Sequence, residues 1–298
     1  MRRILITGGT GQVGTELLRC SWPEDIRLIA PTRTELDLSN CDAVANYVAA
    51  GRFSAVINSG AYTAVDKAES DVLAAWKVNA LAPAALASAA KVEGIPIIHI
   101  STDYVFDGSK DQPYVEDDPV APLGVYGASK EAGEQAVRTG NPRHVILRTA
   151  WVFSEHGTNF VKTMLRLAAE RPLIKIVSDQ KGSPTAARDI ASTIKLIACR
   201  LLEDRGAHFG TYNFVNSGEA TWYDLGVELF EQQGIAGFGV PVLQAIRTSE
   251  YPTPARRPSN SRLSTEKLSH DYGIQPQRWQ AALSETLRAL QKQQGKLP

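Results

Sequence analysis

The sequence predicts an α/β fold: a doubly wound parallel sheet joined to a smaller, mainly helical substrate-binding domain. Short apolar runs alternate with helical patterns through the first half of the 298-residue chain. Such runs, apolar at every position, are typical of parallel strands that are buried on both faces. The second half carries mostly helical patterns, which indicates a change of architecture after about residue 150.

Five apolar runs are expected to form the sheet, at residues 4–6, 28–30, 55–57, 97–100 and 145–147. Helical patterns between them predict helices at residues 14–19, 70–92 and 126–137. Strand and helix therefore alternate, and a strand followed by a crossover helix leads to a parallel neighbour.

The second half predicts five more helices, at residues 159–171, 188–202, 221–232, 264–272 and 279–291, and strands at 173–177 and 211–215. Residues 251–258 carry three prolines, which exclude a helix interior. We expect residues 1–150, with 175–215 returning to them, to form the nucleotide-binding domain. Residues 151–174 and 216–298 should form the substrate-binding domain.

The composition argues against several classes of partner. Lys and Arg together number 32, as do Asp and Glu, so no basic excess points to nucleic acid. Cys20, Cys41 and Cys199 are scattered, which predicts free thiols and no zinc site. No apolar stretch is expected to span a membrane, and the N-terminal apolar run is too short for a signal peptide. We expect a cytoplasmic monomer or homodimer.

A glycine-rich turn follows the first predicted strand and precedes the first helix. The segment contains Gly8, Gly11, Gln12, Val13 and Gly14. Glycines in this context allow positive φ, close approach of the backbone to a pyrophosphate, and tight packing of helix on sheet. The N-terminus of the helix then offers free N–H groups to the phosphates. The turn therefore predicts a Rossmann-type dinucleotide site.

The end of the second strand should contact the adenosine half of the cofactor. Arg33 stands where a 2′-phosphate could bind, which favours NADPH, and Glu35 is close enough to keep NADH possible. Asp37 and Leu38 would flank the adenine. After the third strand, Ala61, Tyr62 and Thr63 could approach the nicotinamide half.

Ser101 and Thr102 come at the end of the fourth predicted strand. Ligands of open α/β sheets bind beyond the carboxyl ends of the strands, so these hydroxyls could contact a substrate oxygen. Tyr126 and Lys130 lie four residues apart, which places them on one face of a helix. We expect the Lys130 ammonium to stabilise phenolate and lower the pKa of Tyr126, so that this pair can exchange a proton.

Together these motifs resemble the extended short-chain dehydrogenase/reductase superfamily. Within it, five segments resemble the dTDP-4-dehydrorhamnose reductase family: residues 64–69, 102–108, 122–127, 148–153 and 179–185, with the proline-rich 251–258 as a sixth. The resemblance implies a catalytic triad of Thr102, Tyr126 and Lys130, with Lys130 also holding the nicotinamide ribose.

The resemblance implies reduction of the C4 ketone of dTDP-4-dehydro-L-rhamnose with NADPH, with NADH as the alternative cofactor, for the synthesis of cell-surface polysaccharides such as O-antigen. Asp103 and Trp151 would contact the sugar. Arg256 and Arg257 are our own candidates for the diphosphate, because guanidinium pairs well with phosphate oxygens. Trp222 could border the sugar pocket.

Some members of this family carry Mg²⁺ between subunits, bound by carboxylates near the first helix and after the Pro-Thr segment. Glu16 is one possible ligand here, but Arg188 stands where further carboxylates would help. A cation repels Mg²⁺, which needs several oxygen ligands. We therefore predict no structural metal. His156 shows no metal-binding spacing.

The sequence leaves two other functions open. A sugar-nucleotide dehydratase or epimerase of the same superfamily is one, but the dehydratases need an acid directly after Thr-Asp, and here Tyr104 fills that position. The other is a non-catalytic NADP-binding regulatory subunit that resembles that of methionine adenosyltransferase.

Overall fold

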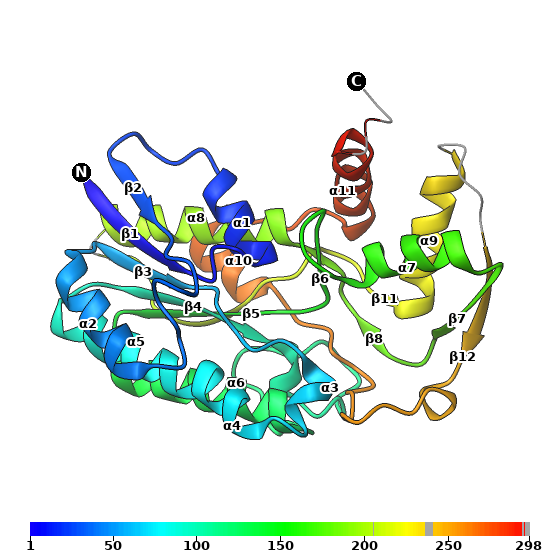
Figure 1. Cartoon of the computed structure of the whole chain (residues 1–298), viewed down its shortest axis with the longest axis horizontal. Helices are drawn as coiled ribbons and strands as arrows, with labels where there is room; N and C mark the ends of the chain where they lie inside the picture. Colours follow the sequence, from blue (N-terminus) through cyan, green and yellow to red (C-terminus); the bar gives the residue numbers. More distant parts are fainter. Residues whose placement is uncertain (205, 236–240, 294, 296–298) are drawn as a thin grey trace.

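The computed structural model describes residues 1–204, 206–235, 241–293 and 295. At its centre lies a six-stranded sheet in the order β10-β5-β4-β3-β1-β2, in which every neighbouring pair is parallel (Figure 1). The strands are β1 (Arg2–Thr7), β2 (Ile26–Ile29), β3 (Ala55–Asn58), β4 (Ile97–Thr102), β5 (His144–Thr149) and β10 (Gly210–Asn213). The five predicted strands are therefore confirmed, and the predicted strand near residue 211 closes one edge.

Helices cover both faces of this sheet (Figure 1). Successive strand residues point to opposite faces, so Ile4 packs in one core and Leu5 in the other. The first core is closed by α1 (Gln12–Arg19), α8 (Ala187–Glu203) and α10 (Glu266–Tyr272). The second is closed by α2 (Cys41–Gly51), α5 (Ala82–Val92) and α6 (Val125–Gly140). The doubly wound fold is thereby confirmed.

A smaller region packs around its own core, at the right of Figure 1. It contains α7 (Phe160–Glu170), α9 (Trp222–Ile235), α11 (Trp279–Gln293), β7 (Leu173–Val177) and β12 (Val242–Ile246). Between the two regions run two short pairings, β6 (Val152–Phe153) with β9 (Thr185–Ala186) and β8 (Lys181–Gly182) with β11 (Ala220–Thr221). The smaller region is mainly helical.

Two of the expected boundaries need correction. We expected the chain to return to the sheet from residue 175, but β7 pairs with β12 in the smaller region, and α8 is the first long helix that returns to the sheet. We assigned residues 216–298 to the smaller region, but Leu268 and Tyr272 of α10 pack in the core of the sheet. Apolar patterns reveal that an element is buried, yet they do not say against which core.

The helix expected at 70–92 is divided into α4 (Val72–Trp76), a π-helical turn (Lys77–Leu81) and α5. By length and composition alone the run Val72–Val92 could cross a membrane, contrary to our expectation for this sequence. Its buried residues include Ala75, Leu86 and Ala90, which pack inside the protein. An apolar helix with these buried residues is typical of the core of a protein. Cys20, Cys41 and Cys199 are free, as predicted.

Sequence reasoning also missed α2, β12 and the short α3 (Val65–Ala68). The capping of α2 was readable, because the Asn40 side chain accepts a hydrogen bond from the Ala43 N–H at 3.0 Å. Strand β12 is half exposed, so it lacks the continuous apolar run that identified the central strands. Two 3₁₀ turns, Asp103–Val105 and Thr248–Glu250, complete the short elements.

Candidate active site

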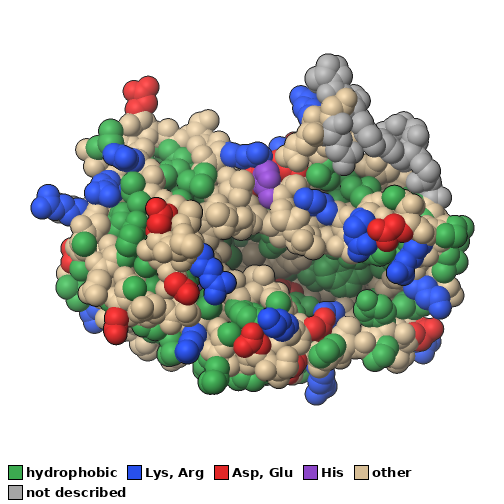
Figure 2. All heavy atoms as spheres, viewed as in Figure 1, with side chains coloured by type: hydrophobic (Ala, Val, Ile, Leu, Met, Phe, Trp, Pro, Cys, Tyr) green, Lys and Arg blue, Asp and Glu red, His purple; other side chains and the backbone are tan. Residues whose placement is uncertain are grey.

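A cleft of about 1300 Å³ runs along the carboxyl ends of β1, β3, β4 and β5 and continues between the two regions. Figure 2 shows this face of the molecule hollowed at its middle. From β1 the chain passes to β2 on one side and then to β3 on the other, so the strand order reverses beside β1. Such a switch point is where open α/β sheets bind ligands. The volume is large enough for a dinucleotide and a second ligand.

The glycine turn forms the floor of the cleft at this switch point. Gly8 has φ +71°, and a Cβ there would lie 2.6 Å from the Cα of Gly60, which follows β3. A Cβ on Gly14 would lie 2.1 Å from the Gly8 carbonyl oxygen. Neither position can hold another residue without displacing backbone. The turn is therefore built for a close approach, as predicted.

The N-terminus of α1 faces the cleft with unpaired donors. Its N-cap residue, Gly11, makes no side-chain capping bond. Gly11, Gln12 and Val13 line the cleft, so the first N–H groups of the helix are available to an anion such as pyrophosphate. This geometry fits a bound dinucleotide.

At the adenosine end of the cleft, Arg33 and Glu35, the two residues that could bind the ribose of the cofactor, are placed differently. Arg33 lines the cleft together with Asp37 and Leu38. Glu35 does not; its carboxylate accepts hydrogen bonds from the Thr32 N–H at 2.7 Å and the Thr32 hydroxyl at 2.9 Å. The residue that could contact a 2′-phosphate is therefore in place, and the acid that could read a 2′-hydroxyl is occupied elsewhere.

Ala61, Tyr62 and Thr63 line the cleft after β3, and a residue missed by sequence reasoning holds them there. Buried Asn79 accepts from the Tyr62 N–H at 2.8 Å and donates to the Tyr62 carbonyl at 3.0 Å. It also donates to the Ser129 hydroxyl of α6 at 3.0 Å. Asn79 lies in the π-helical turn, and π-turns are frequent at functional sites. The signal that could have identified Asn79 is an asparagine at the centre of an otherwise apolar helical run.

Thr102, Tyr126 and Lys130 converge on the wall of the same cleft, as the sequence predicted. Thr102 is the last residue of β4 and pairs in register with Thr149 of β5. Tyr126 and Lys130 lie on successive turns of α6, whose start packs against the 3₁₀ turn Asp103–Val105. Gly127 permits that contact, because a Cβ there would lie 2.2 Å from the Tyr104 carbonyl oxygen.

The expected effect of Lys130 on Tyr126 is not what the structure shows. Burial raises the pKa of Tyr126 to about 12, the Thr102 hydroxyl partly offsets this rise, and Asp103 adds to it. Lys130 is not among the causes, because its ammonium donates to the Ile100 carbonyl at 2.6 Å. The phenol therefore carries its proton at neutral pH, which suits a proton donor rather than a base.

Lys130 itself is buried, and desolvation lowers its pKa to about 8, although Glu134 on the next turn of α6 opposes the shift. Glu134 is fully buried and pairs with Arg148 of β5 at 2.8 Å. An ammonium held in such a place remains mostly charged at neutral pH. It is suited to bind a polar group at the centre of the cleft.

Asp103 lines the cleft together with Thr102, Tyr126 and Lys130, as expected for a substrate contact. Its Oδ1 accepts a hydrogen bond from the Thr102 hydroxyl at 2.9 Å, and its Oδ2 is buried without a protein partner among the described residues. Burial raises the pKa of this carboxyl to about 7. Asp103 therefore stays a candidate for a substrate contact because of its place in the cleft wall.

Trp151 also lines the cleft, two residues after the end of β5, and it stacks on Trp222 of the smaller region.

The two arginines of the proline-rich segment do not line the cleft. Arg256 is exposed and is not among the cleft residues, while Arg257 pairs with Asp66 at 2.9 Å. The diphosphate role predicted for Arg256 therefore has no geometric support, because the segment directs this side chain to the surface.

Comparison with known families decides the assignment. The family model described as RmlD substrate binding domain matches residues 1–292. The chain belongs to this family. A relative named dTDP-4-dehydrorhamnose reductase, from Aggregatibacter actinomycetemcomitans, is 42% identical over 286 residues, which cover 95% of this chain and 97% of the relative.

Solved structures agree with this assignment. A dTDP-4-dehydrorhamnose reductase of Clostridium acetobutylicum superposes with a TM-score of 0.90 at 37% identity, covering 97% of this chain and 99% of that one. A second, from Bacillus anthracis and in complex with NADP, has a TM-score of 0.89 at 33% identity, covering 97% and 99%. The RmlD family likeness thus extends over both regions of the fold.

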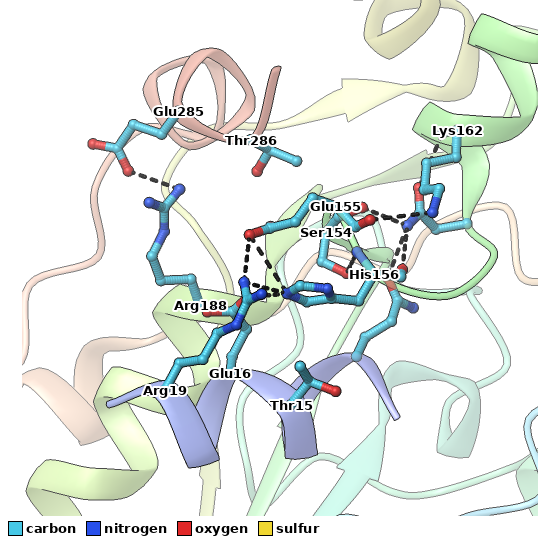
Figure 3. A network of polar contacts seen from close by, with 12 residues as sticks. Thr15, Glu16, Arg19, Ser154, Glu155, His156, Lys162, Arg188, Glu285 and Thr286 are labelled. Atoms are coloured by element: carbon cyan, nitrogen blue, oxygen red, sulfur yellow. Dashed lines mark hydrogen bonds and ion pairs between the residues drawn. The ribbon is translucent and has the colours of Figure 1, made fainter. Parts of the chain in front are cut away.

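In this RmlD-family chain, a charged network lies beside the cleft, between α1 and the loop that precedes α7 (Figure 3). The His156 ring Nε2 lies 2.7 Å from a Glu16 carboxylate oxygen. Arg19 contacts Glu155 at 3.1 Å and Glu16 at 3.8 Å. Sequence reasoning missed His156 and Glu155, since residues 140 positions away from Glu16 give no local signal.

Glu16, Glu155 and His156 lie close enough together that they could hold a metal ion. The Arg19 guanidinium already contacts both carboxylates, and Arg188 pairs with Glu285 at 3.2 Å (Figure 3). These contacts place positive charge where an ion would need carboxylates alone. The absence of a structural metal remains a prediction.

Proposed function

We propose that this chain reduces the C4 ketone of dTDP-4-dehydro-L-rhamnose to dTDP-L-rhamnose with NADPH. The observation that carries the proposal is the convergence of Thr102, Tyr126 and Lys130 in one cleft with the glycine turn. Relatives named for this activity cover almost the whole chain. When bound, the reduced nicotinamide supplies a hydride to the ketone carbon.

Tyr126 is the general acid of the reaction. Its pKa of about 12 keeps it protonated until the ketone oxygen becomes an alkoxide, whose basicity is high enough to take the proton. Thr102 lies beside this phenol and orients the same oxygen by a hydrogen bond. In the present arrangement the Thr102 hydroxyl donates to Asp103, so it must turn to contact the substrate.

Lys130 holds the cofactor ribose next to Tyr126 and keeps a positive charge close to the developing alkoxide. Gly8, Gly11, Gln12 and Val13 line the cleft around the pyrophosphate, and Gly14 packs behind them against the Gly8 carbonyl oxygen. Arg33, Asp37 and Leu38 surround the adenosine, and Ala61, Tyr62 and Thr63 border the nicotinamide half. Asp103 and Trp151 contact the sugar. These assignments rest on the lining of the cleft and on the contacts described above.

NADPH is the preferred cofactor of this proposal, because Arg33 faces the cleft and Glu35 does not. An Arg33→Ala variant should lose about tenfold or more in kcat/KM with NADPH, since a charged contact to phosphate is worth about 1.5–3 kcal/mol. Its kcat/KM with NADH should be unchanged. Equal losses with both cofactors would show that Arg33 does not read the 2′-phosphate.

The proposed activity is tested by a reduction assay with the purified protein, the keto-sugar nucleotide and each cofactor in turn. We expect loss of absorbance at the nicotinamide band and formation of dTDP-L-rhamnose. Binding of NADPH without any turnover would favour a regulatory subunit instead. Release of water from a dTDP-hexose would favour a dehydratase, against which Tyr104 argues, because burial holds its pKa far above neutrality.

The cellular setting follows from the same activity. We propose that the protein works in the cytoplasm, where nucleotide sugars are made, as a monomer or homodimer, without a nucleic acid or membrane partner. Its balanced charge, with 32 basic and 32 acidic residues, and its free thiols support this setting.

A further inference from the structure

Trp151 is held in a slot formed by the smaller region. Its indole lies 3.6 Å, centroid to centroid, from that of Trp222, and the two planes differ by only 7°. This distance is van der Waals contact, so no atom fits between the two rings. One face of Trp151 is therefore covered.

Gly182 covers the opposite face. A Cβ built on Gly182 would lie 2.4, 2.6 and 2.7 Å from Cε2, Cζ2 and Nε1 of Trp151. Three bonded ring atoms at nearly equal distances indicate an approach to the face of the indole, not to its edge. The three nearest atoms all belong to Trp151, so Gly182 lies on the side away from Trp222. Both faces of Trp151 are thus occupied by protein.

The two walls of the slot are tied together. Gly182 of β8 pairs with Ala220 of β11, and Trp222 follows that strand directly. The Trp222 Nε1–H donates to the Gln180 Oε1 at 3.2 Å, and Phe160 packs on Trp222 at 4.8 Å. Trp222 is therefore fixed by a ladder pairing, a hydrogen bond and an aromatic neighbour.

Trp151 adopts φ +48°, a conformation that bulky residues avoid and that costs about 1–3 kcal/mol where it persists. The fold accepts this cost at a residue that lines the cleft together with Thr102, Asp103 and Tyr126. Since both faces are covered, only the edge of the indole can meet a ligand. The strain and the slot act together to fix that edge.

We propose that Trp222 is a positioning residue for the sugar-nucleotide substrate, which acts by holding Trp151 against Gly182 so that the indole edge faces the reacting sugar. This inference rests on the proposed function, since it concerns the substrate of that same cleft. Trp222 does not itself need to touch the sugar; it removes the freedom of Trp151 to swing into or out of the cleft.

Kinetics of four variants test the proposal. Trp222→Ala should raise KM for the sugar nucleotide about tenfold, while KM for NADPH stays within about twofold, because the proposal places the effect on the sugar alone. Trp222→Phe keeps a stacking ring and should recover most of the loss. Gly182→Ala should raise the same KM from the other wall, because its methyl group displaces Trp151. Trp76→Phe, on an exposed indole outside the cleft, is the matched control.

Thermal unfolding of each variant separates a loss of fold from a loss of position. A Trp222→Ala protein that melts like the control but has a raised sugar-nucleotide KM supports the proposal. An unchanged KM in that variant overturns it. Absence of turnover in the unsubstituted protein would instead overturn the proposed function, so the two failures are distinguishable.

A crystal structure with NADP⁺ and dTDP-L-rhamnose tests the same point without kinetics. We expect the Trp151–Trp222 stack to persist with the indole edge against the sugar. A Trp222 ring that swings away to admit the sugar would overturn the proposal and show a gate in its place.

Discussion

Two clusters of ionisable side chains lie on opposite sides of the cleft, and they are built differently. The α6 cluster consists of Tyr126, Lys130, Glu134 and Arg148, of which all but Tyr126 are almost fully buried. The α1 network consists of Glu16, Arg19, Glu155 and His156. In the α1 network every group has a charged or hydrogen-bonding partner, and Arg19 is half exposed.

The difference shows how burial distinguishes a reactive cluster from a network that only joins two elements. In the α6 cluster neither the phenol nor the ammonium forms an ion pair among the described residues, and desolvation raises the pKa of Tyr126 and lowers that of Lys130. In the α1 network the groups pair with one another; Arg19 is half exposed, while Glu16, Glu155 and His156 are largely buried. We propose that the α6 cluster performs the reaction, whereas the α1 network joins α1 to the loop before α7.

The largest expected effect tests the α6 cluster directly. Tyr126→Phe should lower kcat about 10²–10⁴-fold, because the acid that protonates the alkoxide is lost. The dissociation constant for NADPH should change little, since the ring remains. Steady-state assays and a fluorescence titration measure the two quantities. Turnover close to that of the unsubstituted protein would refute the acid role.

Arg148→Met should cost about 3 kcal/mol in the free energy of unfolding, because it leaves the fully buried Glu134 without its main partner. We expect the lower end of the range for buried pairs, as Arg138 still contacts Glu134 at 2.9 Å. Urea unfolding measures the loss. A double variant that also carries Glu134→Gln should regain part of it, and no regain would argue against the charge as the cause.

Lys130 should make NADPH binding dependent on pH. Its lowered pKa of about 8 means that the ammonium is charged below this pH and neutral above it. Affinity for NADPH should therefore fall as the pH rises through about 8, instead of near the usual lysine value of about 10.4. Titrations over this range measure the effect. A Lys130→Met variant should bind more weakly and lose the pH dependence; if it keeps the dependence, another group is responsible.

Arg19→Met tests the α1 network and should cost less than about 1 kcal/mol in unfolding free energy, because the Arg19 side chain is half exposed and Glu16 keeps His156 as a hydrogen-bonding partner. The loss of unfolding free energy in this variant, compared with that of Arg148→Met under the same conditions, measures the contrast between the two clusters. A loss equal to that of Arg148→Met would show that the α1 network is as well shielded as the α6 cluster.

No effect at all is expected from removal of divalent cations. Size-exclusion chromatography with and without a chelator should give the same elution volume, because Arg19 and Arg188 place positive charge beside the carboxylates. A dimer that dissociates with chelator would contradict the prediction of no structural metal, and would assign a second role to Glu16 and His156.

The sequence by itself determined the central sheet, the glycine turn and the three residues that we propose as catalytic. Each depends on spacing within one segment: apolar runs for strands, Gly8 to Gly14 for the turn, and Tyr126 with Lys130 on one helical face. The chemistry of these segments is local, so it can be read without knowing what packs against them. The same reasoning placed Thr102 at the carboxyl end of β4.

Only the tertiary structure decided how these groups behave. The pKa of Tyr126 rises because neighbouring elements bury it and the Lys130 ammonium turns to Ile100. Arg256 stays at the surface, β7 pairs with β12, and Trp222 meets Trp151 across the two regions. Burial, ring stacking and strand pairing join residues far apart in the chain, and no local pattern encodes which partners they meet.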